Sequence, residues 1–268
     1  SGLFTGMRTD ALGDGLAEAL GREGVDLVYL RRKPLRTTLA LVSLGADGGA
    51  RYSFYGEGAA DRAVTVDDLP PLKEVRALMF GCLSLLSVPT GASYLTLAER
   101  AASVADRPLV TLDPNIRPTV EPDMARWRAR VDAFAAHADL VKVSAEDLAA
   151  LHPDLDEAEA AARWRGMGVA LVVVTHGGAG AVAYGAFGEA RASAPAVTVV
   201  DTVGAGDSFI AALMAALEAA GRATPAALAA LTQADAGAAL GYAARAAALT
   251  CSRRGADTPR RADLDALS

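Results

Sequence analysis

Two carboxylates flank a glycine turn in the run Asp201-Thr-Val-Gly-Ala-Gly-Asp207. An apolar, β-like stretch, Val197 to Val200, precedes the turn, and a helix-like stretch, Ser208 to Ala220, follows it. A glycine turn between a strand and a helix directs backbone N–H groups and the positive end of the helix dipole at one point, which suits an anion. A carboxylate beside such a point disfavours simple phosphate binding. Asp207 is therefore a candidate base that takes a proton from an alcohol attacking a phosphoryl group.

A purely structural interpretation of the same residues competes with this one, because Asp is a common N-cap and glycine is common in tight turns. Two features favour chemistry: Asp201 adds a second carboxylate, and capping requires neither Gly204 nor Gly206. The motif lacks the Lys-Ser/Thr of a Walker A loop, and it lacks the order and spacing of a dinucleotide fingerprint. It is therefore neither a P-loop nor a Rossmann turn.

The run Asp201–Asp207, with Ser208-Phe209 after it, resembles the carboxyl-terminal signature of the ribokinase-like (PfkB) carbohydrate kinases. The resemblance implies an α/β fold: a ribokinase-like three-layer sandwich with a mainly parallel central sheet and a small β lid, as a single domain over residues 1–268. It implies that Asp207 is the catalytic base. It also implies that the amides of Gly204, Ala205 and Gly206 form an anion hole for the phosphoryl group transferred from ATP.

The elements that must position these residues follow the same fold class. Short aliphatic runs alternate with longer helix-like stretches, as in a mainly parallel sheet covered by helices. The expected strands are Ala77–Phe80, Leu109–Asp113, Leu140–Val143, Leu171–Thr175, Val182–Tyr184 and Val197–Val200. The expected helices are Ala11–Glu23, Gly91–Ala105, Met124–His137, Ala145–Leu151, Glu157–Met167, Ser208–Ala220 and Pro225–Ala247.

A β-rich segment, residues 36–58, interrupts this alternation. The runs Thr37–Leu44 and Arg51–Tyr55 flank Gly45-Ala-Asp-Gly-Gly49, which is a hairpin signal. A simple extension of the sheet explains the segment as well as a lid over a substrate cleft does. The family resemblance favours the lid, and it implies that the lid also makes a homodimer contact and that Tyr55 binds the substrate.

A second polar loop, Asp113-Pro-Asn115-Ile-Arg117-Pro118, follows an expected strand. It lies at the carboxyl end of that strand, where open α/β sheets hold their ligands. Such a loop can bind sugar hydroxyls while Arg117 neutralises phosphate, although a solvated Arg on a Pro-bounded loop explains it equally well. Fructokinases and 2-keto-3-deoxygluconate kinases of the family carry a similar motif, which implies that Asp113 and Asn115 bind the sugar and that Arg117 assists catalysis.

Acidic residues begin the helix after the next strand, in Lys142-Val-Ser144-Ala-Glu146-Asp147. Paired acids at a helix start often only complement the helix dipole. The family uses Asn-x-x-Glu here to organise Mg²⁺ and its water shell, which implies an indirect metal role for Glu146 or Asp147. Ser144 replaces the Asn, so the choice between the two acids stays open.

Two further segments resemble the nucleotide side of the family. The turn Thr175-His-Gly177-Gly-Ala-Gly180 fits a plain β-turn, but it also resembles the family's Thr-x-Gly-x-x-Gly. That resemblance implies that Thr175, Gly177 and Gly180 line the ATP phosphates and ribose. The segment Leu249–Ala256 resembles the loop that flanks the adenine pocket. It implies that Val203, Ala243 and Ala244 complete the nucleotide site. It also implies that K⁺ is a further cofactor, bound at a site surrounded by Asp201, Val203, Thr250, Arg253 and Gly255.

Composition limits the other possible classes of function. The formal net charge is −6 over 268 residues, and the arginines are scattered, which argues against a nucleic-acid surface. No apolar run reaches the roughly 18 residues that span a bilayer, so no membrane partner is expected. The two cysteines, Cys82 and Cys251, lie far apart within apolar sequence and predict buried free thiols. We therefore expect a soluble, cytoplasmic protein.

The match to the family begins only at Gly6-Met-Arg-Thr-Asp10-Ala-Leu-Gly13, a stretch that lies further along in relatives. The resemblance implies one more strand and helix ahead of it, which carry the usual sugar-binding residues. We expect the intact protein to contain that segment, because a domain without a central strand would expose apolar sheet edges.

The choice of substrate depends on weaker motifs. The runs Arg36–Val42, Ser53–Tyr55 and Gly58–Asp61 resemble bacterial fructokinases most, although Gly56 stands where many relatives have Arg. The resemblance implies ATP-dependent phosphorylation of D-fructose to fructose 6-phosphate. Within the class, 2-keto-3-deoxygluconate or another sugar or nucleoside is the alternative. A non-catalytic sugar or nucleotide sensor on the same fold is the alternative from another class, and the presence of Asp207 argues against it.

Overall fold

The computed structural model describes residues 1–44 and 50–266, and a six-stranded sheet forms its centre. The strand order is β10-β9-β8-β7-β6-β5, in which β5 to β8 run parallel and β9 pairs antiparallel with both β8 and β10. The strands are β5 (Ala77–Gly81), β6 (Leu109–Asp113), β7 (Leu140–Ser144), β8 (Leu171–Thr175), β9 (Ala181–Gly185) and β10 (Gly188–Ala192). The expected mainly parallel sheet is thus confirmed.

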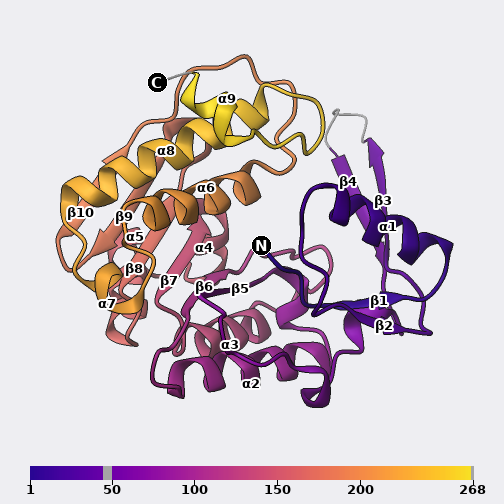
Figure 1. The fold of residues 1–268 in the computed structure, drawn as a ribbon. Helices are drawn as coiled ribbons and strands as arrows, with labels where there is room; N and C mark the ends of the chain where they lie inside the picture. Colours follow the sequence, from indigo (N-terminus) through magenta and orange to yellow (C-terminus); the bar gives the residue numbers. More distant parts are fainter. Residues whose placement is uncertain (45–49, 267–268) are drawn as a thin grey trace.

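Helices cover both faces of this sheet, so the expected three layers are confirmed (Figure 1). One face carries α2 (Thr90–Ser103), α3 (Met124–Ala135), α4 (Ala145–Leu151) and α5 (Glu157–Gly166). The other face carries α6 (Ala205–Ala219), α7 (Pro225–Ala229), α8 (Gln233–Cys251) and α9 (Arg261–Asp265).

Alternation along the central strands decides which side chains face which layer. Val141 and Val143 of β7 belong to the apolar cluster under α2 to α5, whereas Leu140 belongs to the cluster under α6 and α8. Successive side chains of a strand point to opposite faces of its sheet. Lys142 and, by the same alternation on β6, Asp113 therefore lie on the α6 side, at the carboxyl ends of their strands.

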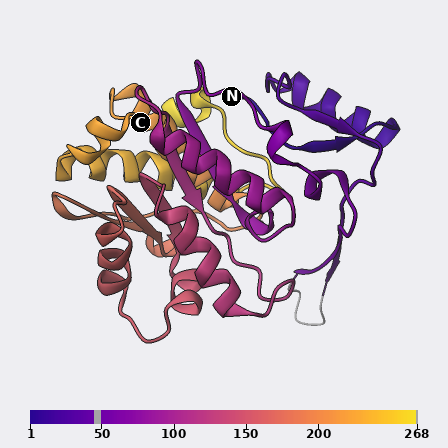
Figure 2. The same ribbon diagram turned by 90° about the horizontal axis from the view of Figure 1, so that it is seen from below.

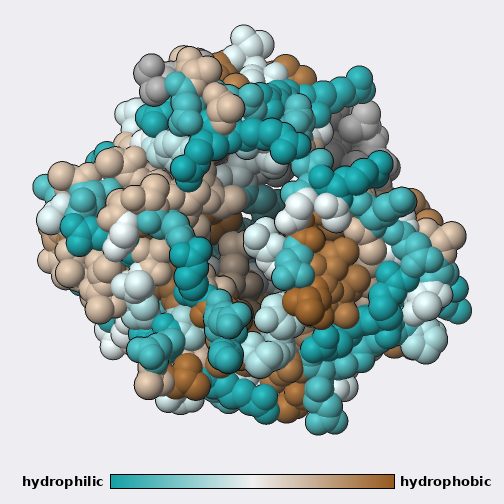
Figure 3. Space-filling model, viewed as in Figure 1, coloured by the Kyte–Doolittle hydropathy of each residue, from teal (hydrophilic) through white to brown (hydrophobic). Residues whose placement is uncertain are grey.

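The amino-terminal part lies beside this body (Figures 1 and 2). It contains β1 (Gly6–Arg8), α1 (Ala11–Arg22) and β2 (Arg31–Lys33), and β1 pairs with β2 in parallel. The hairpin of β3 (Leu39–Leu44) and β4 (Ala50–Tyr55) forms a separate antiparallel sheet, which confirms the predicted hairpin. Its predicted turn, residues 45–49, lies outside the described residues. Figure 3 shows a hollow between this part and the body.

Short 3₁₀ turns complete the connections: η1 (Ala60–Arg62), η2 (Val66–Asp68), η3 (Cys82–Leu85) and η4 (Gly177–Ala179). Side-chain interactions link the amino-terminal part to these turns, among them the hydrogen bond from Arg31 Nε to Asp68 O at 2.9 Å. Lys33 Nζ lies 2.7 Å from Asp68 Oδ2, and Thr38 Oγ1 donates a hydrogen bond to Asp61 Oδ1 at 2.6 Å.

One predicted strand is wrong. Residues 197–200 form no strand, and the side chains of Val199 and Val200 are 62% and 58% exposed. The valines favour extended backbone, but no neighbouring strand pairs with the segment; the N–H of Val200 donates instead to Cys251 O at 2.8 Å. The run therefore serves as an extended connection between β10 and α6.

Helix boundaries also differ from the prediction. The expected helix 225–247 is two helices, because Thr232 and Asp235 form a reciprocal capping box that starts α8 afresh. Helix α6 begins at Ala205, three residues earlier than expected. Strands β1, β2 and β10 were not predicted. Their sequences are Gly-Met-Arg, Arg-Arg-Lys and Gly-Glu-Ala-Arg-Ala, which are short and contain charged residues.

Two expectations about the whole chain can be compared with the structure. Within residues 1–44 and 50–266, no helix combines the length and the apolar character needed to cross a bilayer. Cys82 and Cys251 are both free, as predicted, but they are half-buried and not fully buried.

Candidate active site

The start of α6 gives the site its anion-binding character. Gly204 is the N-cap and adopts the left-handed φ of 79°, which glycine reaches without a Cβ penalty. The N–H of Ala205 donates to Thr202 O at 3.2 Å, whereas those of Gly206 and Asp207 have no acceptor among the described residues. The N–H of Gly204 likewise has no acceptor there, so two of the three predicted amides, those of Gly204 and Gly206, are free together with that of Asp207.

Asp207 lies in the first turn of α6, as the sequence predicts, and its side chain is exposed. An exposed carboxylate at this position can meet an alcohol that enters from solvent. Its negative charge reaches the neighbouring strand ends, since it adds to the burial that raises the pKa of both Asp113 and Cys82. The structure therefore brings the predicted base and the predicted sugar loop together.

A buried ion pair joins the ends of β6 and β7. Lys142 Nζ lies 2.9 Å from Asp113 Oδ2, and the two residues are 5% and 8% exposed. Burial raises the pKa of the Asp113 carboxyl above its ordinary value; the Lys142 ammonium opposes that shift, and the charge of Asp207 adds to it. Asp113 is thus held at the carboxyl edge of the sheet by a charged partner.

The same ammonium also lies against α6. A Cβ built on Gly206 would come within 3.1 Å of Lys142 Nζ, which is closer than an ordinary van der Waals contact. The absence of a side chain at Gly206 lets the lysine head group approach the helix start. Three elements, β6, β7 and α6, therefore meet around one buried positive charge.

The loop after β6 carries the remaining predicted groups. Asn115 has a left-handed φ of 47°, a conformation that asparagine tolerates better than most residues. Arg117 Nη1 donates to Ile116 O at 2.8 Å, and the N–H of Ile116 donates to Asp147 Oδ2 at 3.1 Å. Burial raises the pKa of Asp147 and of Cys82, and the positive charge of Arg117 opposes both rises, so the guanidinium lies near both groups.

Between the two acids considered for Mg²⁺, the structure turns Asp147 toward this loop. Burial raises the pKa of Asp147, while Glu146 is exposed to solvent. Ser144 accepts a hydrogen bond from the N–H of Asp147 at 3.0 Å and thereby caps α4. Across residues 1–44 and 50–266 no three acidic, His or Cys side chains cluster closely enough to hold a metal. Asp147 therefore fits an ion held mainly by water and phosphate.

The predicted nucleotide residues occupy three separate places. Thr175 ends β8, and its hydroxyl lies 3.4 Å from Val143 O. Gly177 begins η4 and Gly180 follows it, with left-handed φ values of 53° and 103°. Val203 is partly exposed before α6. Ala243 and Ala244, in contrast, are 0% and 3% exposed inside the apolar cluster between α8 and the sheet. They present little surface to a ligand, and their nucleotide role stays a prediction.

The predicted K⁺ residues meet around Asp201. Its Oδ1 accepts from the N–H of Val203 at 3.1 Å and its Oδ2 from the N–H of Gly255 at 2.9 Å, and these bonds lower the pKa of Asp201. Thr250 is buried and donates to Ser208 Oγ at 2.7 Å. The side chain of Arg253 turns away to Asp263 at 3.1 Å. The Asp201 carboxylate is thus occupied by backbone amides, and a cation here would need carbonyl oxygens.

Tyr55 is the predicted site residue that lies apart. It ends β4, its side chain is 61% exposed, and none of its described interactions reaches the Asp113–Asp207 cluster. The structure also gives a reason for glycine at the neighbouring position 56, because a Cβ there would lie 2.6 Å from Arg62 Nε. The Arg62 guanidinium occupies the space above Gly56.

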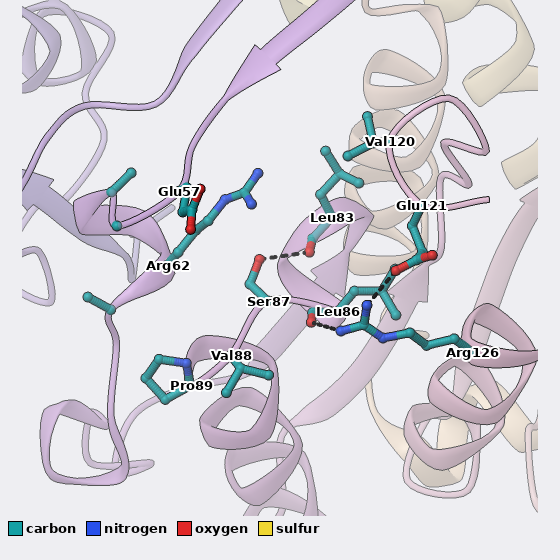
Figure 4. Close-up of a pocket in the computed structure, with 13 residues that line it drawn as sticks. Glu57, Arg62, Leu83, Leu86, Ser87, Val88, Pro89, Val120, Glu121 and Arg126 are labelled. Atoms are coloured by element: carbon teal, nitrogen blue, oxygen red, sulfur yellow. Dashed lines mark hydrogen bonds and ion pairs between the residues drawn. The ribbon is translucent and has the colours of Figure 1, made fainter. Parts of the chain in front are cut away.

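Arg62 also faces a cavity of about 440 Å³ between the lid and the body (Figure 4). On the opposite wall, Ser87 donates to Leu83 O at 3.0 Å and Arg126 donates to Leu86 O at 3.2 Å. Asp207, Asp113 and Arg117 do not line this cavity. It is therefore adjacent space and not the centre of the predicted chemistry.

Sequence reasoning assigned no role to two residues of the cluster. Lys142 is a charged residue inside the buried run Leu-Val-Lys-Val-Ser, and a charge within a buried strand is itself a signal of a paired group. Cys82 follows β5 with a left-handed φ of 60°, and burial raises the pKa of its thiol. Nothing in the sequence around Cys82 predicts this conformation.

Comparisons with known proteins identify the family of the chain. The sequence pattern of the pfkB family carbohydrate kinase matches residues 6–263. A fructokinase of Rhizobium leguminosarum bv. trifolii is 42% identical over 216 residues, which cover 80% of this chain and 65% of that protein. A fructokinase of Vibrio alginolyticus is 30% identical over 218 residues, 81% of this chain and 70% of that protein. The aligned region thus spans slightly less than two thirds of the Rhizobium protein.

Solved structures give the same result. Fructokinase from Vibrio cholerae O395, with fructose, ADP and calcium ion bound, superposes with a TM-score of 0.84 at 28% identity, covering 99% of this chain and 84% of that one. Aminoimidazole riboside kinase from Salmonella enterica, with aminoimidazole riboside and an ATP analogue, has a TM-score of 0.83 at 26% identity and the same coverage. The fold, the position of Asp207 and the family match over residues 6–263 lead to one conclusion: the chain belongs to the pfkB family of carbohydrate kinases.

Proposed function

We propose that the chain catalyses the ATP-dependent phosphorylation of a sugar, with D-fructose as the acceptor and fructose 6-phosphate as the product. The observation that carries this proposal is the position of Asp207, an exposed carboxylate beside the free amides of a helix start. Those amides suit a phosphoryl group, and the carboxylate suits the alcohol that attacks it. The relatives named fructokinase, and the fructose and ADP in the Vibrio cholerae structure, support the substrate.

In the proposed reaction the Asp207 carboxylate takes the proton of the 6-hydroxyl of fructose. The resulting oxygen forms a bond to the γ-phosphorus of ATP, while the bond from that phosphorus to the bridging oxygen breaks. The leaving oxygen keeps the electron pair as part of ADP. The free amides of Gly204, Gly206 and Asp207 and the guanidinium of Arg117 stabilise negative charge on the moving phosphoryl group.

We further propose that Asp113 and Asn115 accept and donate hydrogen bonds to sugar hydroxyls, since both lie on the loop at the carboxyl edge of β6. Asp147 would orient water around Mg²⁺, and the bound ion supplies positive charge to the phosphates of ATP. K⁺, if the protein uses it, would bind carbonyls near Asp201 and Gly255, because the Asp201 carboxylate already accepts two backbone N–H groups.

Two alternatives have specific support. An aminoimidazole riboside kinase of Salmonella typhimurium is 30% identical over 206 residues, so a riboside acceptor belongs in any substrate comparison. The loop Asp113–Arg117 also resembles that of 2-keto-3-deoxygluconate kinases. A non-catalytic sensor is the alternative from another class, and it has no use for an exposed base at Asp207.

A coupled assay of ADP release tests the proposal, with fructose, 2-keto-3-deoxygluconate, ribose, adenosine and aminoimidazole riboside as acceptors. We expect the highest kcat/KM with fructose. A higher kcat/KM with another acceptor would retain the kinase and replace the substrate. ADP release with none of them, alongside ligand binding measured by calorimetry, would favour the sensor.

A further inference from the structure

Lys142 is a buried charge to which the proposed mechanism gives no role. It is 5% exposed on β7, between apolar residues. Burial of an ammonium group disfavours the folded state unless a partner compensates it, and a buried ion pair is often no more stabilising than apolar side chains of the same volume. Stability alone therefore gives a weak reason for a lysine here.

The contacts of Lys142 indicate a more specific role. An ammonium group has three N–H donors, and Asp113 Oδ2 accepts one of them at 2.9 Å. Asp113 is its one hydrogen-bond partner within residues 1–44 and 50–266. The Nζ atom also lies beside Gly206, where an added Cβ would come within 3.1 Å. Lys142 thus stands between the proposed sugar loop and the proposed phosphoryl site.

The charges around it explain what a cation does at this point. Asp113 and Asp207 are both acidic, and the charge of Asp207 adds to the burial that raises the pKa of Asp113. The charge of Arg117, on the same loop, opposes the rise in the pKa of Asp113. The charge of Asp113 in turn acts on Asp147 of α4 and on the Cys82 thiol, so these groups also lie near it. Among these groups, Lys142 is the one that contacts Asp113 directly.

We propose that Lys142 is a positioning residue for phosphoryl transfer: it fixes the Asp113 carboxylate for the sugar and offsets its negative charge beside Asp207. The inference rests on the proposed function. With the lysine in place, one carboxylate binds a hydroxyl while the other takes a proton. Without it, Asp113 loses the one direct cationic contact that it has within residues 1–44 and 50–266, and can turn or become protonated.

A double-mutant cycle tests this role with Lys142→Met, Asp113→Asn and the double variant. We expect each single variant to lower kcat/KM for the sugar by about 10²-fold, as for a misplacement of a substrate-binding group, while KM for ATP stays within about twofold. The double variant is expected to lose about the same factor as either single variant, since the two residues act as a unit. Lys142→Arg is expected to recover part of the loss.

Two outcomes would overturn the inference. One is a wild-type kcat/KM for the sugar in Lys142→Met. The other is a double variant that loses the product of the two single factors, because Lys142 would then act on the phosphoryl group independently of Asp113. Lys33 and Asp68 provide a matched control: their ion pair, at 2.7 Å, lies away from the cluster, and Lys33→Met with Asp68→Asn is expected to leave kcat/KM unchanged.

The same variants separate this inference from the proposed function. If none of the tested acceptors causes the wild-type protein to release ADP, the proposed function fails. The pairing of Lys142 with Asp113 is then judged from melting temperatures. We expect Lys142→Met to lower Tm and the double variant to recover at least half of that loss, since the unpaired buried carboxylate is removed. An unchanged Tm in Lys142→Met, or no recovery in the double variant, would contradict the pairing. If Lys142→Met does not fold, the double variant and Lys142→Arg still supply the kinetic comparison.

Discussion

The two sides of the hollow differ in how firmly the fold holds their side chains. At the carboxyl edge of the sheet, Asp113 and Lys142 are buried and paired, and the turn before α6 is tied to the Gly255 loop by Asp201. On the lid, Leu39, Leu41 and Tyr55 are 52%, 57% and 61% exposed. The core thus holds the groups for phosphoryl transfer and the proposed sugar contact Asp113, whereas the proposed sugar contact Tyr55 lies on an open hairpin.

This difference has a chemical consequence. Phosphoryl transfer depends on fixed charges at fixed positions, because little of its rate comes from covalent chemistry by the protein. A substrate-binding lid can instead close over the acceptor after it binds. Changes on the core side are therefore expected to reduce kcat, and changes on the lid side are expected to alter KM for the sugar.

The largest effect is expected at the base. Asp207→Asn should lower kcat by about 10² to 10⁴-fold, since the amide cannot take the proton from the attacking hydroxyl, while the Kd for ATP changes little. ADP release and calorimetry measure the two quantities. Asp106→Asn is the matched control, because this exposed acid precedes β6 and so lies at the opposite end of that strand from Asp113. Normal turnover in Asp207→Asn would remove the base from the mechanism and with it the contrast between the two sides.

Arg117 should give the next largest effect. Arg117→Met removes a guanidinium that lies near Asp147 and Cys82, and we expect kcat to fall by about 10²-fold as charge on the phosphoryl group loses its partner. Steady-state kinetics with varied sugar and varied ATP measure it. Arg165→Met, on the exposed face of α5, should behave as wild type. A change in KM for the sugar with kcat unchanged would show that Arg117 binds the sugar and does not act on the phosphoryl group.

The lid should respond differently and more weakly. Tyr55→Phe is expected to raise KM for the sugar by about two- to tenfold, the loss of one hydrogen bond, with kcat unchanged. Tyr55 has no described link to the Asp113–Asp207 cluster, so transmission to kcat is not expected. Initial-rate measurements over a range of sugar concentrations check this. A fall in kcat with KM unchanged would show that the lid takes part in the chemical step.

The smallest effect concerns stability on the core side. Backbone hydrogen bonds from Val203 and Gly255 lower the pKa of Asp201, so its ionised form favours the folded state. That contribution is complete above the ordinary pKa of 3.8 and is lost as the pH falls through the lower folded-state value. The stability difference between wild type and Asp201→Asn should therefore shrink below about pH 4 in denaturant unfolding. A difference that is constant with pH would contradict the role of the ionised carboxylate.

Sequence patterns predicted the central elements well because local signals and burial agree there. Helix 145–151 and strands 109–113 and 171–175 match in full, since each is a continuous apolar run or a capped helix. Val197–Val200 failed because β-branched residues indicate extended backbone, and only a neighbouring strand can make that backbone part of a sheet. A local run of residues does not determine whether another strand lies beside it and pairs with it.

The site was predicted to a similar degree. Motifs placed Asp207, Asp113 and Arg117 at strand and helix ends, and the fold brings those ends together. The pairing of Lys142 with Asp113 depends on the alternation of β7 under α6 and on the missing side chain at Gly206. The occupied amide of Ala205 depends on where α6 begins. Both are tertiary facts that single motifs do not encode.

One measurement tests the central claim most directly: ³¹P NMR of the protein with ATP, Mg²⁺ and fructose. With Asp207 as the base, we expect the ATP resonances to be replaced by those of ADP and of a phosphomonoester. The phosphorus of that ester should be coupled to the protons of a primary carbon of fructose. The Asp207→Asn variant should produce that ester at least about 10² times more slowly. Appearance of ADP with inorganic phosphate and no ester, or equal rates of ester formation in the two proteins, would contradict the account.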